Sequence, residues 1–158
     1  KIRHLSPFFV AIKTNNLEVV ELFCDSGVDL NVKTRCGYTP LLYAAIKGCD
    51  KICLYLSLRV KNIDQQDPDG QTVLTHYLLK NDIEKVKILV LRGANINFIN
   101  SKGLTPLHFA IEAGLPESII NTLLKLGADP HYEDKNGKDC CEKVVEEGLY
   151  LDTDIFYQ

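Results

Sequence analysis

Apolar residues recur at helical spacing in several short segments of this chain. Residues 16–23 and 82–89 place them three or four positions apart, which puts them on one face of a helix. Gly27 and Gly93 follow these segments, where glycine can end a helix in the left-handed conformation. The pattern predicts short amphipathic helices. None of them can bury its apolar face by itself, so neighbouring helices must cover it.

A second segment recurs at a stride of 33 residues and predicts another set of helices. It reads Gly-Leu-Thr-Pro-Leu-His-Phe-Ala at 103–110, Gly-Gln-Thr-Val-Leu-Thr-His-Tyr at 70–77, Gly-Tyr-Thr-Pro-Leu-Leu-Tyr-Ala at 37–44 and, in part, Ser-Pro-Phe-Phe-Val-Ala at 6–11. The glycine permits the positive φ of a tight turn. The threonine can cap the helix that follows, and the proline fits its first position. We therefore expect each unit to consist of a helix, a second helix and a hairpin.

A period of about 33 residues that contains Thr-Pro-Leu-His-x-Ala is the signature of the ankyrin repeat, and the chain resembles that family over nearly its whole length. The resemblance implies an all-α solenoid of stacked helix-turn-helix units joined by β-hairpin fingers. We expect a single domain, residues 1–158, with units of about 1–33, 34–66, 67–99, 100–133 and 134–158. The last unit is expected to be a truncated C-terminal cap with a short second helix at 149–157. The first has lost the glycine and threonine of the motif, so it is either an unusual cap or preceded by another repeat.

Three departures from the repeat carry structural expectations. Val60 stands where the helix-ending glycine belongs, so this helix should end differently, with the turn at Lys61 and Asn62. Tyr77 replaces the small alanine of the motif, and its ring should push two helices apart or open a local pocket. The fourth unit has one extra residue between its helices, where Pro116 can stand at the start of the second helix.

Composition narrows the class of protein. Hydrophobic residues make up 46% and charged residues 25% of the chain, as in a folded globular domain. The net charge of −3 argues against a nucleic-acid binder dominated by phosphate contacts. No apolar run approaches the ~20 residues of a membrane span, and the first residues lack the apolar core of a secretory signal. We expect a monomer in the cytoplasm, or alternatively the nucleus, without membrane insertion. The N-terminus also lacks a Met, so we expect the chain to be a piece of a longer protein.

Cysteine and histidine are the residues most open to a chemical interpretation. The six cysteines are expected to be reduced, with Cys24 and Cys53 buried as small hydrophobes on second helices. Cys49 and Cys53 lie four positions apart, but no second pair of ligands accompanies them for a metal. The family resemblance implies a structural His108, which bonds backbone groups and the threonine hydroxyl of a neighbouring unit. We therefore expect no catalytic residue, no cofactor and no metal site.

Function is inferred from the family resemblance, which implies a protein–protein interaction module. Such proteins bind their partners across the hairpin tips and the concave face formed by the inner helices. An alternative is a substrate-recruiting or regulatory segment of a larger enzyme or adaptor whose catalytic domain lies outside this chain. The positions expected to bind a partner protein or peptide are Arg35, Tyr38, Lys47, Pro68, Asp69, Gln71, Lys80, Phe98, Ile99, Lys102, Leu104, Glu112 and Lys135.

Two patterns stand out among these positions. Apolar or aromatic residues occur at the tips, which indicates either a contact surface or packing between fingers. The charges on the inner helices also change sign along the chain, from lysine at positions 13, 47 and 80 to glutamate at 112, 146 and 147. This polarity would orient a charged partner, or it reflects only a solvated surface.

Overall fold

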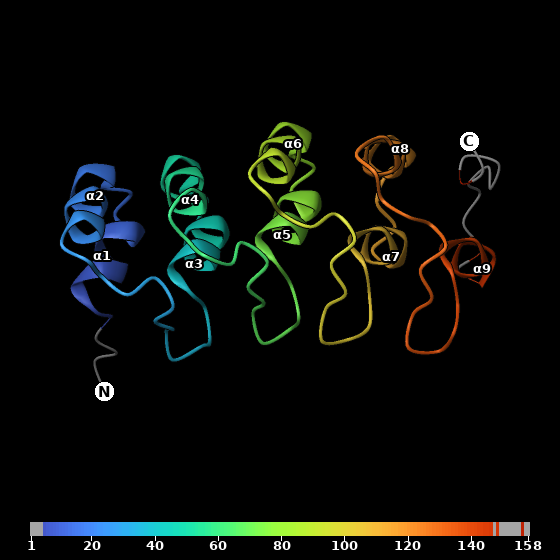
Figure 1. The fold of residues 1–158 in the computed structure, drawn as a ribbon, viewed down its shortest axis with the longest axis horizontal. Helices are drawn as coiled ribbons and strands as arrows, with labels where there is room; N and C mark the ends of the chain where they lie inside the picture. The colour runs from blue at the N-terminus through green and yellow to red at the C-terminus, as the bar shows by residue number, and fades with distance from the viewer. Residues whose placement is uncertain (1–4, 147, 149–155, 157–158) are drawn as a thin grey trace. The chain divides into compact units, whose positions relative to one another are not determined.

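The structure of the chain is a computed structural model, and it describes residues 5–146, 148 and 156. These residues form two compact units, Lys1–Val73 and Leu74–Gln158, which we call the N-terminal and C-terminal units. The N-terminal unit holds α1 to α4 and the C-terminal unit α5 to α9, with the first residue of α5 at the boundary (Figure 1). Over the described residues the structure contains no strand and nine helices: α1 (Pro7–Lys13), α2 (Leu17–Asp25), α3 (Pro40–Lys47), α4 (Asp50–Ser57), α5 (Val73–Leu79), α6 (Ile83–Leu91), α7 (Pro106–Glu112), α8 (Glu117–Lys125) and α9 (Cys140–Glu146). The expected all-α architecture is confirmed, while the helix expected at 149–157 lies outside the described residues.

The helices follow the stride that the sequence predicts. First helices begin at residues 7, 40, 73, 106 and 140, and second helices at residues 17, 50, 83 and 117. Each spacing is therefore 33 residues until the fourth repeat, where it becomes 34. The turn between the two helices of a repeat contains a left-handed residue, at Asn15, Gly48, Asn81 and Gly114, still 33 apart. The inserted residue consequently follows Gly114, and Pro116 is the N-cap of α8, at the helix start where it was expected.

Side-chain caps mark the start of α3, α7 and α9. Thr39 and Thr105 each accept a backbone N–H three positions further on, and the helix starts at the next residue, a proline. In the last repeat Asp139 takes the place of threonine. Its carboxylate accepts the N–H of Glu142 at 3.0 Å, and the Glu142 carboxylate accepts the N–H of Asp139 at 3.2 Å. This reciprocal capping box satisfies two backbone donors at the start of α9.

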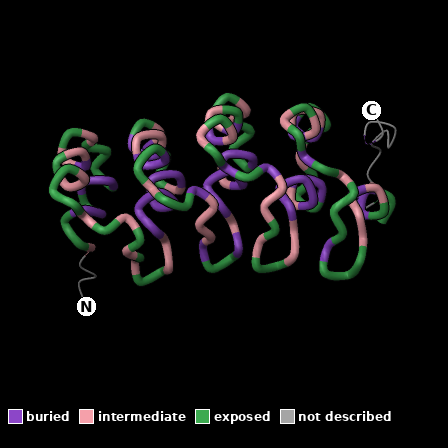
Figure 2. Tube along the Cα trace, viewed as in Figure 1, coloured by how far each residue is buried: buried purple, intermediate pink, exposed green. Residues whose placement is uncertain are grey.

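Apolar side chains of the helices form the core of each unit. In the N-terminal unit α1 packs on α2 and α3, and α3 packs on α4, with buried positions concentrated on α3 (Figure 2). Aromatic rings join these helices, because the ring centroids of Phe8 and Phe23 lie 5.4 Å apart and those of Phe9 and Tyr43 lie 5.3 Å apart. In the C-terminal unit α7 packs on α8 and α9, and the motif alanine, Ala110, is fully buried as close helix packing requires.

Helix α4 ends differently from α2 and α6, as its missing glycine predicts. It stops at Ser57, one position earlier in the repeat than the other two. The turn expected at Lys61 and Asn62 is wrong, because neither residue has a positive φ. Instead the N–H of Val60 donates to the carbonyl of Leu56 at 3.0 Å, so the chain leaves the helix without a left-handed residue.

Only one of the two cysteines expected in the core is fully buried. Cys53 has no exposed surface, but Cys24 is half-buried, so the expectation for Cys24 is wrong. Val90, which occupies the same position two repeats later, is also half-buried, so this position is only partly covered in both repeats. All six cysteines are free thiols. Burial raises the pKa of Cys140 to about 12, which makes that thiol a core residue without nucleophilic character.

Each hairpin finger is closed by the same backbone hydrogen bonds. In the second repeat the N–H of Thr34 donates to the carbonyl of Tyr38 at 2.9 Å, and the N–H of Gly37 donates to the carbonyl of Thr34 at 2.9 Å. The side chain of the first residue also accepts an N–H from the turn. The arrangement recurs in the fingers that begin at Asp67, Asn100 and Asp134. The fingers are therefore tight turns whose tips have a fixed conformation.

Neighbouring fingers of the N-terminal unit pack closely at Gly37 and Pro68. Gly37 has a φ of +85°, and a Cβ added to it would lie only 2.6 Å from Cγ of Pro68. Gly27 has a similar φ of +81°, but nothing lies within 4 Å of a Cβ added there. The two glycines thus share one backbone requirement and differ in the space around them.

We expect Gly27→Ala to lower the free energy of unfolding by about 1–2 kcal/mol, because a Cβ disfavours the left-handed conformation. Gly37→Ala should cost more, since a collision with the Pro68 ring is added to the same backbone strain. Urea unfolding followed by circular dichroism measures both changes. Equal losses for the two variants would contradict the close packing of these fingers.

Candidate partner-binding surface

Three of the expected partner-binding residues meet at one pocket in the N-terminal unit. Arg35, Tyr38 and Lys47 contribute to the lining of a cavity of about 840 Å³ beside α1, α3 and the finger that precedes α3. Arg35 and Lys47 are exposed, and Tyr38 is half-buried. The finger positions the first two residues, whereas Lys47 is the last residue of α3. Folding of the second repeat therefore gathers side chains that are up to 12 positions apart in the sequence.

Aromatic side chains form the inner wall of this pocket, which we call the aromatic pocket. Phe8, Phe9 and Tyr43 line it and are each less than a tenth exposed, and the half-buried Phe23 also contributes. The Lys47 ammonium lies 5.4 Å from the centroid of the Tyr43 ring, within range of a cation–π interaction. Burial raises the pKa of the Tyr43 hydroxyl, which therefore stays neutral. The sequence signal for this wall is the Phe8–Phe9 pair, at positions that hold leucine in the second repeat.

Pro68, Asp69 and Gln71 lie on the third finger, also in the N-terminal unit. Pro68 and Asp69 are exposed at its tip. The N–H groups of Asp69 and Gln71 both donate to Oδ1 of Asp67 at 2.9 Å, which fixes the turn. Gln71 is half-buried, and its side-chain oxygen is buried without a hydrogen-bond partner among the described residues. The first two residues thus offer their side chains to a partner more fully than Gln71 does.

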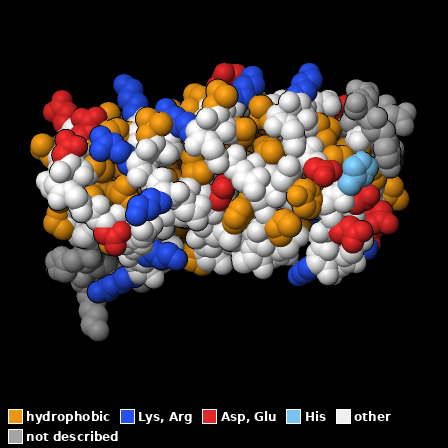
Figure 3. All heavy atoms as spheres, in the orientation of Figure 1, with side chains coloured by type: hydrophobic (Ala, Val, Ile, Leu, Met, Phe, Trp, Pro, Cys, Tyr) orange, Lys and Arg blue, Asp and Glu red, His pale blue; other side chains and the backbone are white. Residues whose placement is uncertain are grey.

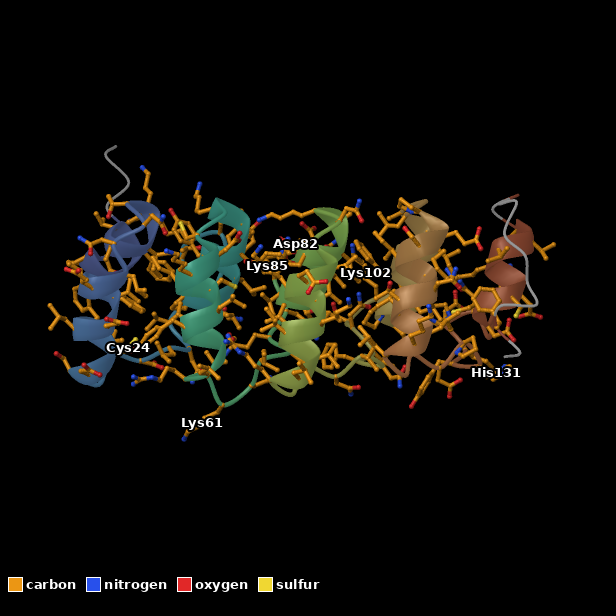
Figure 4. All side chains as sticks on the ribbon, turned by 90° about the horizontal axis from the view of Figure 1, so that it is seen from above. Cys24, Lys61, Asp82, Lys85, Lys102 and His131 are labelled. Atoms are coloured by element: carbon orange, nitrogen blue, oxygen red, sulfur yellow. The ribbon has the colours of Figure 1, made fainter. Side chains whose placement is uncertain are left out.

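Lys80 lies just after α5 in the C-terminal unit and is exposed. Its ammonium is 5.2 Å from the centroid of the buried Tyr77 ring, and that of Lys85 is 5.8 Å from the same centroid. Lys85 also pairs with Asp82 at the start of α6 (Figure 4), and this hydrogen bond lowers the pKa of Asp82. The ring that replaces alanine is therefore accommodated beneath two cations. Whether it separates the two helices of its repeat stays a prediction.

The apolar tip residues of the C-terminal unit differ in exposure. Ile99 is 50% exposed, whereas Phe98 and Leu104 are half-buried. The N–H of Leu104 donates to Oδ1 of Asn100 at 3.0 Å, which holds the finger closed. Ile99 therefore presents the largest apolar surface of the three, and the other two divide their surface between the finger and solvent.

The basic tip residues of the C-terminal unit are both exposed. Lys102 lies on the fourth finger and Lys135 on the fifth. These fingers touch, because a Cβ added to Gly103 would lie 3.1 Å from Cβ of Lys135. The two ammonium groups therefore project from neighbouring turns whose backbones are in contact.

Glu112 differs from the other expected residues because an internal ion pair occupies it. The buried Lys143 pairs with Glu112 and, at 3.2 Å, with Asp134. Asp134 also accepts the N–H groups of Asn136 and Lys138. Burial by itself raises the pKa of Asp134, but these N–H groups and Lys143 outweigh it and hold the pKa at about 2. Burial opposes the charge on Lys143 too, and the hydrogen bonds to Glu112 and Asp134 raise its pKa overall.

The glutamates of the expected charge pattern are therefore largely neutralised by ion pairs within the chain. Glu146 pairs with Lys138, as Glu112 does with Lys143. Glu147 lies outside the described residues. On the basic side, Lys13 and Lys47 are exposed in the N-terminal unit. A charged partner would thus meet a stronger field from the lysines than from the glutamates.

His108 contacts a neighbouring repeat, but not through the expected threonine. Its Nδ1 lies 2.8 Å from Oγ1 of Thr105 in its own repeat, and its Nε2 lies 3.3 Å from the carbonyl oxygen of Lys138 in the next. A carbonyl can only accept, so Nε2 carries the proton and Nδ1 accepts from the hydroxyl. Burial lowers the pKa of His108, against the effect of the Lys138 carbonyl. The neutral imidazole is the form that fits this site.

The polar network around Asp134 was not foreseen from the sequence. Its signal is the series Thr34, Asp67, Asn100 and Asp134, which places a small polar residue at the start of every finger.

Among the described residues, no group of three or more His, Cys, Asp or Glu side chains is placed to hold a metal. No helix in this part of the chain is both long and apolar enough to cross a membrane.

We expect Lys143→Met to lower the free energy of unfolding by about 2–3 kcal/mol, because it leaves the buried Asp134 carboxylate without its cation. Lys138→Met is the matched control, since it removes the ion pair with Glu146 at a partly exposed position and should cost less than about 1 kcal/mol. Urea unfolding measures both. A control that costs as much as Lys143→Met would contradict the role of the buried pair.

Stability should fall as the pH is lowered through the ordinary histidine pKa of 6.5, because His108 binds its proton less readily in the folded chain than in the unfolded one. The stabilisation is complete above this pH and is lost toward the lower pKa of the folded state. His108→Gln should flatten the dependence of the urea midpoint on pH between about 7.5 and 5.5. His131→Gln, at an exposed histidine of the same unit, is the control and should leave the dependence in place. An unchanged slope in His108→Gln would refute the assignment.

Comparison with known proteins agrees with the repeat geometry. A family model of ankyrin repeats in three copies matches residues 2–64 and 55–134. An ankyrin repeat protein of Fowlpox virus is 33% identical over 132 residues, which are 82% of this chain and 39% of that protein. The B-cell lymphoma 3 protein homolog of Mus musculus is 37% identical over 104 residues, 65% of this chain and 23% of that protein. The nuclear factor NF-kappa-B p105 subunit of Gallus gallus is 32% identical over 114 residues, 68% of this chain and 11% of that protein.

The chain therefore spans less than half the length of each of these three relatives. The family model, by contrast, covers most of the chain, from the first repeat into the start of the fifth. Helix starts, capping residues and left-handed turns recur over the same residues at one stride. By its sequence and by its helical pairs, the chain belongs to the ankyrin-repeat family.

Proposed function

We propose that this chain binds a partner protein or peptide through its finger tips and the exposed ends of its first helices. Ankyrin repeats are in general protein–protein interaction modules. The observation that carries the proposal is the uniform construction of the fingers, each closed by backbone hydrogen bonds at its base. A turn fixed before binding loses little conformational entropy when a partner docks on it. Each finger would therefore act as a rigid contact.

Two groups of side chains would make the contact, one in each unit. In the N-terminal unit they are Arg35, Tyr38 and Lys47 around the aromatic pocket, with Pro68 and Asp69 on the next finger. In the C-terminal unit they are Lys80, Phe98, Ile99, Lys102, Leu104 and Lys135. Gln71 and Glu112 would contribute less, because one is half-buried and the other is held by Lys143.

In this proposal the chain acts by binding and not by catalysis. It is a monomer in the cytoplasm or nucleus, and its partner is a protein and not a nucleic acid. The net charge of −3 supports a protein partner, because phosphate contacts need a basic surface. The alternative function is the recruiting or regulatory segment of a larger enzyme or adaptor. The lengths of the relatives support this alternative, because each relative extends well beyond the region that matches this chain. The full-length reading frame would discriminate between the two.

Replacing Tyr38, Phe98 and Leu104 together by serine should abolish capture of the cellular partner while the helical circular-dichroism signal persists. The reason is that aromatic and apolar side chains carry most of the energy of protein contacts. Affinity capture with mass spectrometry measures the loss. Separate variants at Tyr38 and at the Phe98–Leu104 pair would assign the contact to the N-terminal unit, the C-terminal unit or both.

A control variant removes three exposed leucines elsewhere in the chain. Leu22, Leu58 and Leu91 are 65%, 65% and 87% exposed and lie on or at the end of second helices, away from the fingers. Their joint replacement by serine should leave capture intact. If the tip variant still retrieves the same partner, or if the control loses it equally, the proposed surface is wrong.

A further inference from the structure

The aromatic pocket of the N-terminal unit has the features of a site for one kind of peptide. We propose that it takes an acidic peptide segment, with one bulky apolar side chain in the pocket and carboxylates on either side. This inference rests on the proposed function and names the chemistry of the partner at that surface. Its support comes from the volume, the lining and the charge of the pocket.

The interior of the pocket suits a large apolar side chain. Its volume of about 840 Å³ lies within the range of ~300–1,000 Å³ that ligand pockets commonly have. The inner wall consists of the rings of Phe8, Phe9, Phe23 and Tyr43, held by one another at centroid distances of 5.3 to 6.2 Å. Rings that brace one another in this way keep the cavity from collapsing when it is empty. An aromatic or branched aliphatic side chain would complete their packing.

The rim of the pocket carries charge of one sign. Lys33, Arg35 and Lys47 are exposed and belong to the lining, and no aspartate or glutamate does. Figure 3 shows basic side chains gathered over the finger that precedes α3. Such a rim attracts carboxylates and repels cationic segments, which gives selectivity among apolar partners.

The chain's own first residues are poor candidates for the occupant. Residues 1–4 lie outside the described part, and their sequence Lys-Ile-Arg-His carries the same sign of charge as the rim. Charge complementarity therefore favours a segment from a different molecule. Such a segment must bring negative charge to both ends of the pocket.

The length of α3 gives a scale for the spacing of the carboxylates. Lys33 and Arg35 precede α3, whereas Lys47 ends it. The helix has eight residues, and a rise of about 1.5 Å per residue separates its ends by about 10 Å. An extended peptide covers about 10 Å in three residues. The best match is therefore an apolar anchor with acidic residues one or two positions away on each side.

The test uses the full 158-residue chain and a fluorescein-labelled peptide of sequence Gly-Asp-Asp-Phe-Asp-Asp-Gly. Fluorescence polarisation measures its affinity. Two control peptides carry asparagine for aspartate or glycine for phenylalanine, and each should bind at least about tenfold more weakly. Binding of the acidic peptide should also weaken as salt is added, because the rim is exposed.

A charge-reversed chain tests whether binding takes place at this pocket. Lys33→Glu, Arg35→Glu and Lys47→Glu together should lower the affinity for the acidic peptide by about tenfold or more. The matched control reverses Lys51, Lys61 and Lys125, which are exposed, are not part of the lining and change the net charge equally. Lys61, for example, points away from the helices (Figure 4). This control should stay within about twofold of the unsubstituted chain.

A second measurement reads the pocket directly and does not depend on substitution. Cys36 is exposed and lines the pocket, so bound peptide should slow its alkylation by iodoacetamide, monitored by mass spectrometry. Cys141, a half-buried thiol outside the lining, should react at the same rate with and without peptide.

Several results would overturn the proposal. They are equal losses in the rim variant and its control, equal binding of the asparagine peptide, and unprotected Cys36. If the acidic peptide fails to bind while the serine variant at Tyr38, Phe98 and Leu104 still loses the cellular partner, the peptide chemistry is refuted and the proposed function stands.

Discussion

Burial of the first helices against their neighbours, α1 and α3 in the N-terminal unit and α7 and α9 in the C-terminal unit, is the interaction on which the rest of this structure depends. The first helices are seven or eight residues long, and helices of that length are unstable in isolation. In α3 the side chains of Leu41, Leu42, Ala44 and Ala45 have little or no exposed surface because α1 and α4 cover them. Each fully buried leucine contributes about 1.5–3 kcal/mol relative to an exposed one. Since the fingers connect these helices, their position is set by the same packing.

Polar interactions add to this apolar packing in the last repeats. In the C-terminal unit, α7 and α9 are joined by the ion pair of Glu112 with Lys143, and α7 also reaches the last finger through His108 and the Lys138 carbonyl. Burying a charge is costly unless partners satisfy it. Here Lys143 has two carboxylates, and Asp134 has two N–H groups besides the lysine. Such a network orients the repeats more specifically than apolar packing does, because hydrogen bonds depend on direction.

The surface available to a partner follows from this division between core and fingers. The residues that recur in every repeat form the turns, the helix caps and the helix packing. These positions therefore differ little from one repeat to the next. The wall of the aromatic pocket depends on the Phe8–Phe9 pair, which is not repeated, because leucine matches Phe8 in each of the three following repeats. Over the Tyr77 ring, Lys85 is likewise local to one repeat, because isoleucine or valine occupies its position in the other repeats. Within an array of similar units, recognition of a particular partner must depend on such unrepeated side chains.

The features that could be predicted from the sequence are those that one repeat determines by itself. The positive φ of Gly37 and Gly103, the caps at Thr39 and Thr105 and the extra residue before α8 all depend on residues a few positions apart. One prediction that failed, the turn after α4, also concerns residues a few positions apart. The turn after α4 was misplaced because Leu56 and Val60 continue a helical hydrogen bond where the other repeats use glycine.

The tertiary structure alone decided which side chains meet between repeats. The partner of His108 is a carbonyl 30 positions away, Lys143 reaches across 31 positions to Glu112, and the aromatic pocket combines residues from three helices and a finger. The expected partner-binding residues remain predictions, although the structure places three of them at that pocket. The stride of 33 residues identifies equivalent positions in different repeats. The distance between two equivalent side chains depends on how closely neighbouring repeats pack. This packing is determined by all the core side chains together.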